Sequence, residues 1–385
     1  MTAAKSKSNP TFSLSLVVGH LVNDTSTNSL SGLLPALTAA YGLSYLLAGV
    51  LAAVFNITSS ILQPLLGRWF DRTQAAWLLE VGIAMNCIAI SLIGISPSFA
   101  VLLLLVGIGG LGSAAFHPPA FSAVVRSSGS SRGGAIGVFV SGGNVGFFLG
   151  PMVAGVLVSA LGLRGTLLLL PVGVFTAVFL FRIRARKQQG IPPSARQLRP
   201  ANKHLLALLM AITALRSIAI QIPVTFLPLY FVSRGDSLLV ATSIGSFWLA
   251  AGVLGQLAGG FLSDHVGRRP VIAASLLAGA LVFYGFMTTG GPLSLLLLAV
   301  CGALFYASWS VIVVMSSEAA PNNIGAVTGS MLGFSVGMGA FGVLGFGGAA
   351  DVLGFASAFY VVIAFALAGG LVALFLPGRV KTTSQ

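Results

Sequence analysis

The stretch RIRARKQQGIPPSARQLRPANKH, residues 182–204, is the only long hydrophilic segment of the chain. It stands at the middle of 385 residues, and its proline, glutamine and basic content is typical of a mobile linker. The chain as a whole is 56% hydrophobic and 7% charged, with a mean hydropathy of +0.99. Since about a quarter of the residues of a soluble domain are charged, this composition indicates an integral membrane protein.

Six apolar stretches precede the linker and six follow it. Each is long enough to cross a bilayer as a helix, which takes about 20 residues. The stretches are too long for barrel strands and show no strand-like alternation, so helices are expected. The expected spans are residues 14–40, 45–67, 75–95, 99–122, 134–160, 165–182, 204–232, 238–262, 270–289, 292–315, 325–349 and 355–376.

The connections between these spans carry basic residues mainly on one side. Counted along alternate connections from the N-terminal tail, one side holds 17 Lys and Arg residues, and the other holds only Arg164 and Arg234. Because cytoplasmic connections are enriched in Lys and Arg, we expect both termini and the linker in the cytoplasm. Topology then explains the formal net charge of +13, and no nucleic-acid partner is expected.

Residues recur between the two halves at a nearly constant offset. The matches are Leu34-Pro35 with Leu227-Pro228, Gln63 with Gln256 and Asp71 with Asp264 at 193 positions, and Gly142 with Gly333 at 191. Parallel repeats of six helices are the arrangement of the major facilitator transporters. We therefore predict an all-α integral membrane protein with twelve transmembrane helices in two pseudo-symmetric six-helix bundles. The predicted bundles are residues 1–181 and 204–385, joined by a cytoplasmic linker at 182–203.

The first span, which contains VVGHLVNDTSTNS at residues 17–29, has a polar face in an apolar setting. His20, Asn23, Asp24, Thr27 and Asn28 follow the three-and-four spacing of one helix face. A charged side chain near the bilayer centre costs about 2.5 kcal/mol or more, so such residues normally face a cavity and have a function. The spacing therefore predicts that the first helix turns this face toward water inside the protein.

Only Asp24 and Arg216 are charged residues clearly inside the expected spans, and they lie in equivalent helices of the two repeats. We predict that both face one central cavity. Asp24, assisted by His20 one turn earlier, would take up and release a proton, and Arg216 would attract an anionic substrate group. The alternative is that each belongs to a structural ion pair or a buried hydrogen-bond network.

Further polar residues are candidates for a substrate pocket edged by aromatic rings. His117, followed by Pro118 and Pro119, would either bind substrate or cap a helix that kinks or ends there. Each of these residues could instead serve helix packing alone. The candidate substrate-binding residues are Asn23, Asn28, Gln63, His117, Asn144, Arg216, Tyr306 and Trp309.

Two short motifs are candidates for gating elements. GRWFDR (67–72) and GGFLSDHVGRR (259–269) occupy equivalent cytoplasmic ends, and the second resembles the major facilitator signature GxxxDxxGRR. They would act as latches between rocking halves, or their arginines would only fix the topology. A glycine stripe with a proline in the fifth span would allow bending, or would only pack closely. The candidate gating residues are Asp71, Arg72, Gly142, Gly146, Gly150, Pro151, Gly260, Asp264, Arg268 and Arg269.

Neither a cofactor nor a metal site is expected. Cys87 and Cys301 lie far apart within spans and are predicted to be packing residues. The sequence contains no HExxH, no CxxC and no phosphate-cradling loop. The expected partners are therefore a small-molecule substrate, protons and the lipid bilayer, and a monomer is expected.

Several segments together resemble the fosmidomycin resistance protein family of bacterial major facilitator transporters. They are GHLVNDTSTNSLSGLLPAL, FNITSSILQPLLGRWFD, FHP, GGNVGFFLGP and IGAVTGSMLGFSVGMGAFGVLGFGGAAD, together with Glu318 and the closing FLPG. The resemblance implies a multi-pass protein of the bacterial inner membrane that exports a small phosphonate antibiotic in exchange for protons. It assigns importance to His20, Asn23, Asp24, His117 and the glycines of the fifth span. Pro119 replaces the glutamate that the family has after His-Pro, so any proton coupling by that carboxylate is lost or has moved to Asp24.

The sequence thus predicts a proton-coupled antiporter that exports a small, anionic, fosmidomycin-like drug or metabolite by alternating access. A proton-coupled importer of a small organic anion would use the same fold, and the sequence hardly separates the two directions. A membrane-embedded enzyme or a non-transporting sensor is a third alternative. It is disfavoured because no catalytic constellation and no soluble signalling domain are present.

Overall fold

The computed structural model describes residues 10–127, 132–184, 202–320 and 324–378. Within these ranges the chain is helical and contains no strand. The helices are α1 (Pro10–Tyr41), α2 (Tyr45–Thr73), α3 (Leu78–Leu92), α4 (Phe99–Ser127), α5 (Arg132–Leu161), α6 (Leu169–Arg184), α7 (Lys203–Ser233), α8 (Leu238–Val266), α9 (Arg268–Thr288), α10 (Gly291–Ala319), α11 (Ile324–Ala358) and α12 (Tyr360–Ala373). Two 3-10 turns, η1 (Ile93–Ile95) and η2 (Leu163–Leu168), precede α4 and α6. The predicted all-α fold of twelve helices is confirmed.

The helices have the length and composition of a multi-pass membrane protein. In the described part of the chain, 10 helices are long and apolar enough to cross a membrane, and α12 is a shorter apolar helix. The polar face of α1 keeps its hydropathy below theirs, although α1 has 32 residues. α11 is broken at Gly354, where φ is +76°, a conformation that glycine adopts easily. The short helical segment after the break ends at Ala358, and α12 begins at Tyr360.

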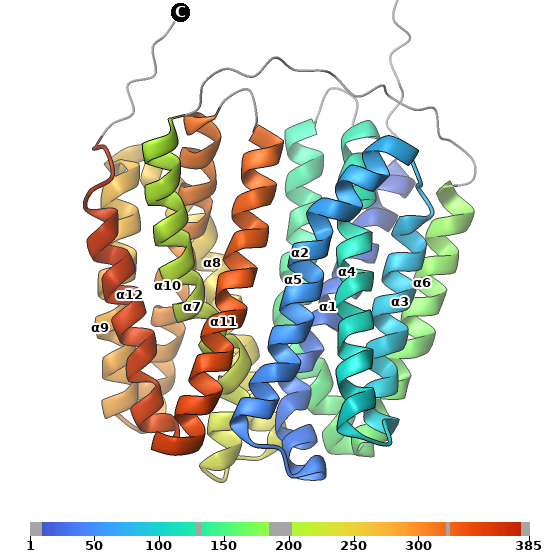
Figure 1. Ribbon diagram of the computed structural model, residues 1–385, viewed down its shortest axis with the longest axis horizontal. Helices are drawn as coiled ribbons and strands as arrows, with labels where there is room; N and C mark the ends of the chain where they lie inside the picture. The colour runs from blue at the N-terminus through green and yellow to red at the C-terminus, as the bar shows by residue number, and fades with distance from the viewer. Residues whose placement is uncertain (1–9, 128–131, 185–201, 321–323, 379–385) are drawn as a thin grey trace, which may run out of the picture. The chain divides into compact units, whose positions relative to one another are not determined.

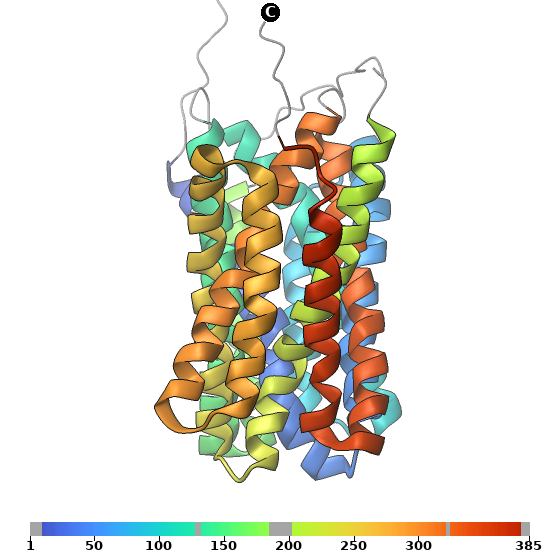
Figure 2. The ribbon, with the colours of Figure 1, turned by 90° about the vertical axis from the view of Figure 1, so that its left-hand side faces the viewer.

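The chain forms two compact units. The first comprises Met1–Leu43, Leu51–Pro193 and Phe231–Ser246, and the second comprises Ser44–Val50, Ser194–Tyr230 and Phe247–Gln385. In the first unit α1 packs on α5, and α3 packs on α4 and α6 (Figure 1). In the second, α9 packs on α10 and α12 (Figure 2). Residues 185–201 of the proposed linker lie outside the described residues, and the division at 182–203 stays a prediction.

The segment Ser44–Val50 is held within the second unit by a carboxylate. Asp351 on α11 accepts hydrogen bonds from the backbone N–H groups of Tyr45 at 2.7 Å and Leu46 at 2.9 Å. These N–H groups belong to the first turn of α2, where the helix has no acceptors of its own. The negative charge of Asp351 also lies at the positive end of the helix dipole.

The glycine stripe of α5 lies directly against α1. A Cβ atom at Gly142 would be 2.7 Å from the carbonyl oxygen of Val17, and one at Gly150 would be 2.7 Å from Cβ of Asn28. A Cβ at Gly146 would overlap the carbonyl oxygen of Leu21. Side-chain-free positions therefore allow the two helix backbones to touch, as small residues do between membrane helices. This geometry gives the stripe a packing role, and its gating role stays a prediction.

We expect Gly150→Val to destabilise the protein, because the new side chain would force α5 away from α1. Overpacking of this kind costs about 1–3 kcal/mol. The matched control is Gly137→Val on the same helix, since a Cβ there meets nothing within 4 Å. Thermal unfolding of the purified proteins in detergent provides the measurement. Equal unfolding temperatures for the two variants would show that the α1–α5 contact does not contribute to stability.

Of the two possibilities for α4 at Pro118-Pro119, a helix end is wrong, because the helix continues to Ser127 with both prolines inside it. Helix α3 buries both Glu80 and Asn86. Glu80 forms an ion pair of 2.7 Å with Arg184 of α6, which compensates the cost of burying its charge.

Candidate functional site

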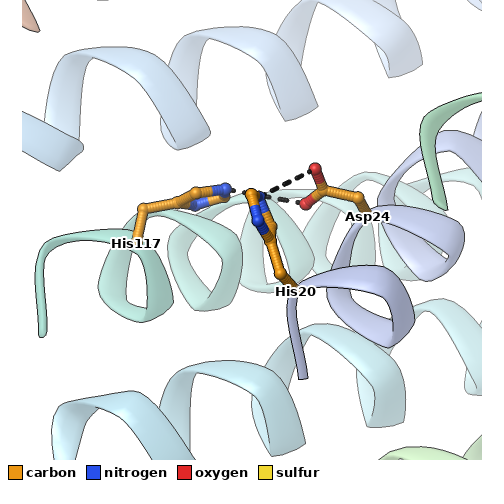
Figure 3. Close-up of side chains that lie close together, drawn as sticks. All are labelled: His20, Asp24 and His117. Atoms are coloured by element: carbon orange, nitrogen blue, oxygen red, sulfur yellow. Dashed lines mark ion pairs between the residues drawn. The ribbon is translucent and has the colours of Figure 1, made fainter. Parts of the chain in front are cut away.

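A cluster of two histidines and one aspartate joins α1 to α4. Asp24 lies one helical turn after His20, and His117 reaches the same carboxylate from α4 (Figure 3). The Nε2 atom of His20 is 3.2 Å from Oδ2 of Asp24, and the Nε2 atom of His117 is 3.6 Å from Oδ1. We refer to His20, Asp24 and His117 as the triad. Sequence analysis assigned all three to function but placed His117 with the substrate rather than with Asp24.

Backbone carbonyl groups fix the protonation pattern of both imidazole rings. The Nδ1 atom of His20 is 2.9 Å from the carbonyl oxygen of Phe139, and that of His117 is 2.7 Å from the carbonyl oxygen of Ser113. A carbonyl oxygen can only accept, so each Nδ1 must carry a hydrogen and donate it. In a neutral ring the Nε2 atom is then unprotonated, and its lone pair points toward the carboxylate.

When both rings are neutral, the lone pairs of the two Nε2 atoms therefore face the carboxylate oxygens of Asp24 with no hydrogen between them. Asp24 contributes an acceptor-only carboxylate, and each neutral ring contributes an acceptor nitrogen. A proton on one Nε2 atom converts the repulsion into an ion pair with a charge-assisted hydrogen bond. Imidazole changes its charge close to neutral pH in water, and it is therefore suited to such an exchange. The chemistry of this arrangement is the reversible binding of a cation.

The surroundings of the triad combine burial with limited access. The ring of His20 stacks on Phe139, with centroids 4.2 Å apart, and its side chain is 8% exposed. The side chains of Asp24 and His117 remain 18% and 22% exposed. Gly143 of α5 faces the triad, and a Cβ there would overlap Nε2 of His20 and approach Oδ2 of Asp24 to 2.9 Å. The missing side chain at Gly143 leaves space beside the two ligand atoms.

A buried amide network holds the α1 side of the triad. Asn86 of α3 donates through Nδ2 to the backbone oxygen of Asn23, to its side-chain Oδ1 and to Thr27 Oγ1, each at 3.0 Å. The Nδ2 atom of Asn23 in turn donates to Oδ1 of Asp24 at 3.0 Å. Asn23 thus contacts Asp24 directly, and Asn86 is a contributor that is not among the candidate residues of the sequence analysis. A fully buried amide in an apolar helix requires partners, and that was the available signal.

Arg216 on α7 is a buried cation of the second unit. Its Nε–H donates to Ser308 Oγ at 2.8 Å and to the carbonyl oxygen of Phe305 at 3.2 Å, and the side chain lies against α10. The guanidinium carbon lies 5.8 Å from the ring centre of Tyr306 and 5.2 Å from that of Trp309. These are cation–π distances, so the two rings stabilise the buried guanidinium group.

No carboxylate of the chain neutralises Arg216. All seven Asp and Glu residues lie in the described ranges, and none forms an ion pair with Arg216. Arg216 therefore has no ion-pair partner among these residues, whereas its bonds to Ser308 and Phe305 fit the alternative of a buried hydrogen-bond network. A buried charge without a counter-charge is costly, and an anionic ligand would compensate it. Tyr306 and Trp309, predicted as an aromatic wall, are in contact with this cation.

The remaining substrate candidates are less tightly grouped. Asn28 donates through Nδ2 to the backbone oxygen of Asp24 at 2.9 Å, so its amide is bonded within its own helix. Gln63 on α2 and Asn144 on α5 are half-buried and contribute no bond to the Asn23–Asn86 network. The expectation that Asp24 and Arg216 share one cavity concerns both units and stays a prediction.

The predicted latch residues are exposed or half-buried, and their gating role stays a prediction. Asp71, Arg72 and Asp264 are exposed, and neither aspartate forms an ion pair within the part of the chain that the structure describes. Arg268 instead pairs with Glu318 at the end of α10, at 2.5 Å. A Cβ atom built on Gly260 would lie 3.2 Å from Oγ of Ser310, so α8 and α10 are in close contact at this position. Arg269 is half-buried at the start of α9.

A twelve-helix membrane fold with polar and charged side chains buried between its helices defines a carrier of small molecules rather than an enzyme. The chain belongs to the Major Facilitator Superfamily, whose sequence profile matches residues 16–332. The family consists of transporters, so the expectation that the protein is not an enzyme is confirmed.

Individual relatives agree with this assignment over nearly the full length. The chain is 27% identical to the fosmidomycin resistance protein of Escherichia coli, covering 97% of this chain and 95% of that protein. It is 29% identical to the MFS-type transporter YfnC of Bacillus subtilis, covering 95% and 93%. Among solved structures, an inward-facing bacterial homolog of the human lysosomal transporter Spinster superposes with a TM-score of 0.83 at 17% identity, covering 96% of this chain and 98% of that one. The predicted family resemblance is confirmed.

Proposed function

We propose that the protein exports a small anionic compound, such as a fosmidomycin-like phosphonate, in exchange for protons. It would do so by alternating access in the inner membrane of a bacterium, with both termini and the linker in the cytoplasm. The resistance function in the name of the Escherichia coli relative supports the direction of transport. Family membership supports the carrier mechanism.

The observation that carries the proposal is the unpaired charge of Arg216. Its Nε–H is engaged with α10, which orients the guanidinium group, and no carboxylate of the chain compensates its charge. A phosphonate or carboxylate group would supply the missing negative charge, and a guanidinium fork binds such groups through two parallel hydrogen bonds. Tyr306 and Trp309 would then form the aromatic edge of the binding site.

The triad supports the second half of the proposal, the exchange of protons. When both rings are neutral, its nitrogen and oxygen lone pairs face one another without an intervening hydrogen, and the partial exposure of Asp24 and His117 gives protons access. Asp24 with His20 would hold the transported proton, and His117 would share it. Asn23 would orient the carboxylate through its hydrogen bond. The predicted gating residues of α2, α5, α8 and α9 would act during the rocking movement.

A sensitivity screen tests the proposal. The gene is expressed in a bacterium that lacks its own drug pumps, and growth is compared on phosphonates and on cationic drugs. We expect protection against anionic phosphonates and none against cations. Protection against cations alone would overturn the assignment of Arg216 as the substrate anchor.

Direction is tested separately by uptake of the protective compound into inverted and right-side-out vesicles under a proton gradient. An exporter accumulates the compound in inverted vesicles when their interior is acidic. Gradient-driven accumulation only in right-side-out vesicles would instead identify an importer of the same anion.

A further inference from the structure

We propose that the triad is also a binding site for a divalent first-row transition-metal ion, with Zn²⁺ as the reference ion. The three ligand atoms come from His20, Asp24 and His117, and all lie within 4.8 Å of one another. Sequence analysis expected no metal site, because Cys87 and Cys301 lie far apart and no metal-binding motif is present, and it did not place His117 beside the other two residues. The fold brings it to the same point (Figure 3).

The donor set and its spacing fit such an ion. Two imidazole nitrogens and one carboxylate are ligands that Zn²⁺ commonly takes, and three protein ligands leave a position for water. Metal–ligand bonds of about 2.0–2.2 Å place neighbouring ligand atoms about 3.3–3.6 Å apart in a tetrahedral site. The Nε2 atom of His20 is 3.2 Å from Oδ2 of Asp24, the Nε2 atom of His117 is 3.6 Å from Oδ1, and the three ligand atoms lie within 4.8 Å of one another. Movement of the His117 ring and rotation of the carboxylate would bring the three ligand atoms to the tetrahedral spacing.

The groups behind the ligands hold them in the required state. A metal-binding histidine usually donates its other ring N–H to a carbonyl or carboxylate, which fixes the tautomer and orients the ring. Both histidines of the triad have this arrangement, His20 with the carbonyl of Phe139 and His117 with that of Ser113. Asn23 donates to the carboxylate in the same way. The site is therefore organised before any ion binds.

The triad also has space for a metal ion and a route by which the ion can reach it. Gly143 contributes no side chain beside Nε2 of His20 and Oδ2 of Asp24, so an ion there would not meet a Cβ. The ion-pair partners of Asp24 in the described chain are the two histidines alone, so no Lys or Arg side chain occupies the position of the cation. Partial exposure of Asp24 and His117 gives an ion a route to the site.

Binding of the metal would compete with transport, and this consequence rests on the proposed function. The ion would use the same lone pairs that receive the proton, so a loaded site could not exchange protons. We expect Zn²⁺ to inhibit proton-driven export. The binding itself does not depend on what the protein transports.

The first experiment measures metal binding to the purified full-length protein in detergent. Co²⁺ is titrated while its visible d–d absorption is followed, and Zn²⁺ is titrated by calorimetry. We expect one equivalent to bind the wild type and the affinity to fall at least about 10-fold in His117→Ala. The matched control is His265→Ala, because His265 also bonds an i−4 carbonyl through Nδ1 but lies exposed on α8. Equal affinity in wild type and His117→Ala would overturn the proposal.

The second experiment needs no variant and therefore does not depend on folding. Diethyl pyrocarbonate modifies unprotonated imidazole nitrogens, and modified histidines are identified by peptide mass spectrometry. We expect Zn²⁺ to protect His117 while His265 reacts at an unchanged rate. Unchanged modification of His117 at saturating Zn²⁺ would contradict a triad site. Metal binding without export would refute only the proposed function, and proton-driven export without metal binding would refute only this inference.

Discussion

Asp24→Asn is expected to abolish proton-driven export while leaving the protein folded. Asparagine has the shape of aspartate, and its amide can donate to the unprotonated Nε2 atom of His20, which is 3.2 Å from the carboxylate in the native site. The substitution therefore preserves packing and replaces one hydrogen bond. It removes the negative charge that stabilises a proton on either histidine, so the site no longer exchanges protons.

The measurement uses proteoliposomes in which substrate movement is followed with and without an imposed proton gradient. Gradient-driven transport should fall at least about 100-fold, the scale of positioned proton-transfer groups. Exchange of labelled for unlabelled substrate without a gradient should remain within a few-fold of wild type. Asp236→Asn is the control, since Asp236 lies exposed between α7 and α8. Full gradient-driven transport by Asp24→Asn would remove the triad from the coupling mechanism.

Arg216→Gln is expected to weaken the binding of an anionic substrate without abolishing proton binding at the triad. Hydrogen bonds to charged groups contribute about 1.5–3 kcal/mol, so the half-saturating substrate concentration should rise about 10- to 100-fold. Glutamine keeps a hydrogen-bond donor toward Ser308 and fills much of the same volume. Loss of fold is therefore a smaller concern than with alanine.

Arg216→Lys separates charge from geometry at the same position. A lysine retains the positive charge but lacks the planar fork, so its substrate affinity should lie between those of the wild type and Arg216→Gln. Arg164→Gln, at an exposed position in η2, controls for a general loss of basic charge. Unchanged affinity in Arg216→Gln would show that the anion binds elsewhere and that the guanidinium group is structural.

The sequence predicted those features that depend on single segments. Apolar length and the distribution of Lys and Arg indicated the helices, and the three-and-four spacing placed His20, Asn23 and Asp24 on one face of α1. The high cost of charge in a membrane singled out Asp24 and Arg216. Each of these inferences uses only local spacing and the physics of the bilayer.

The features that were missed depend on contacts between segments far apart in the chain. His117 faces Asp24 because α4 packs beside α1, and no spacing rule relates residue 117 to residue 24. Asn86 joins the network across 63 positions of sequence. No sequence pattern indicated a partner for Arg268, which pairs with Glu318 of α10. Sequence repeats predict equivalent positions, and they do not predict which partner a charge selects.

The contact of α5 with α1 has a mechanical consequence for the triad. Because Gly142, Gly146 and Gly150 leave no side chains between the two backbones, sliding or tilting α5 alone would drive it into α1. The pair should consequently move as one stiff rod, carrying His20 and Asp24 with it and leaving His117 on a different helix. Any bend that shifts the rod along α4 by a fraction of a turn would open or close the gap between Asp24 and His117. The affinity of the triad for its cation should therefore depend on the position of the α1–α5 pair along α4.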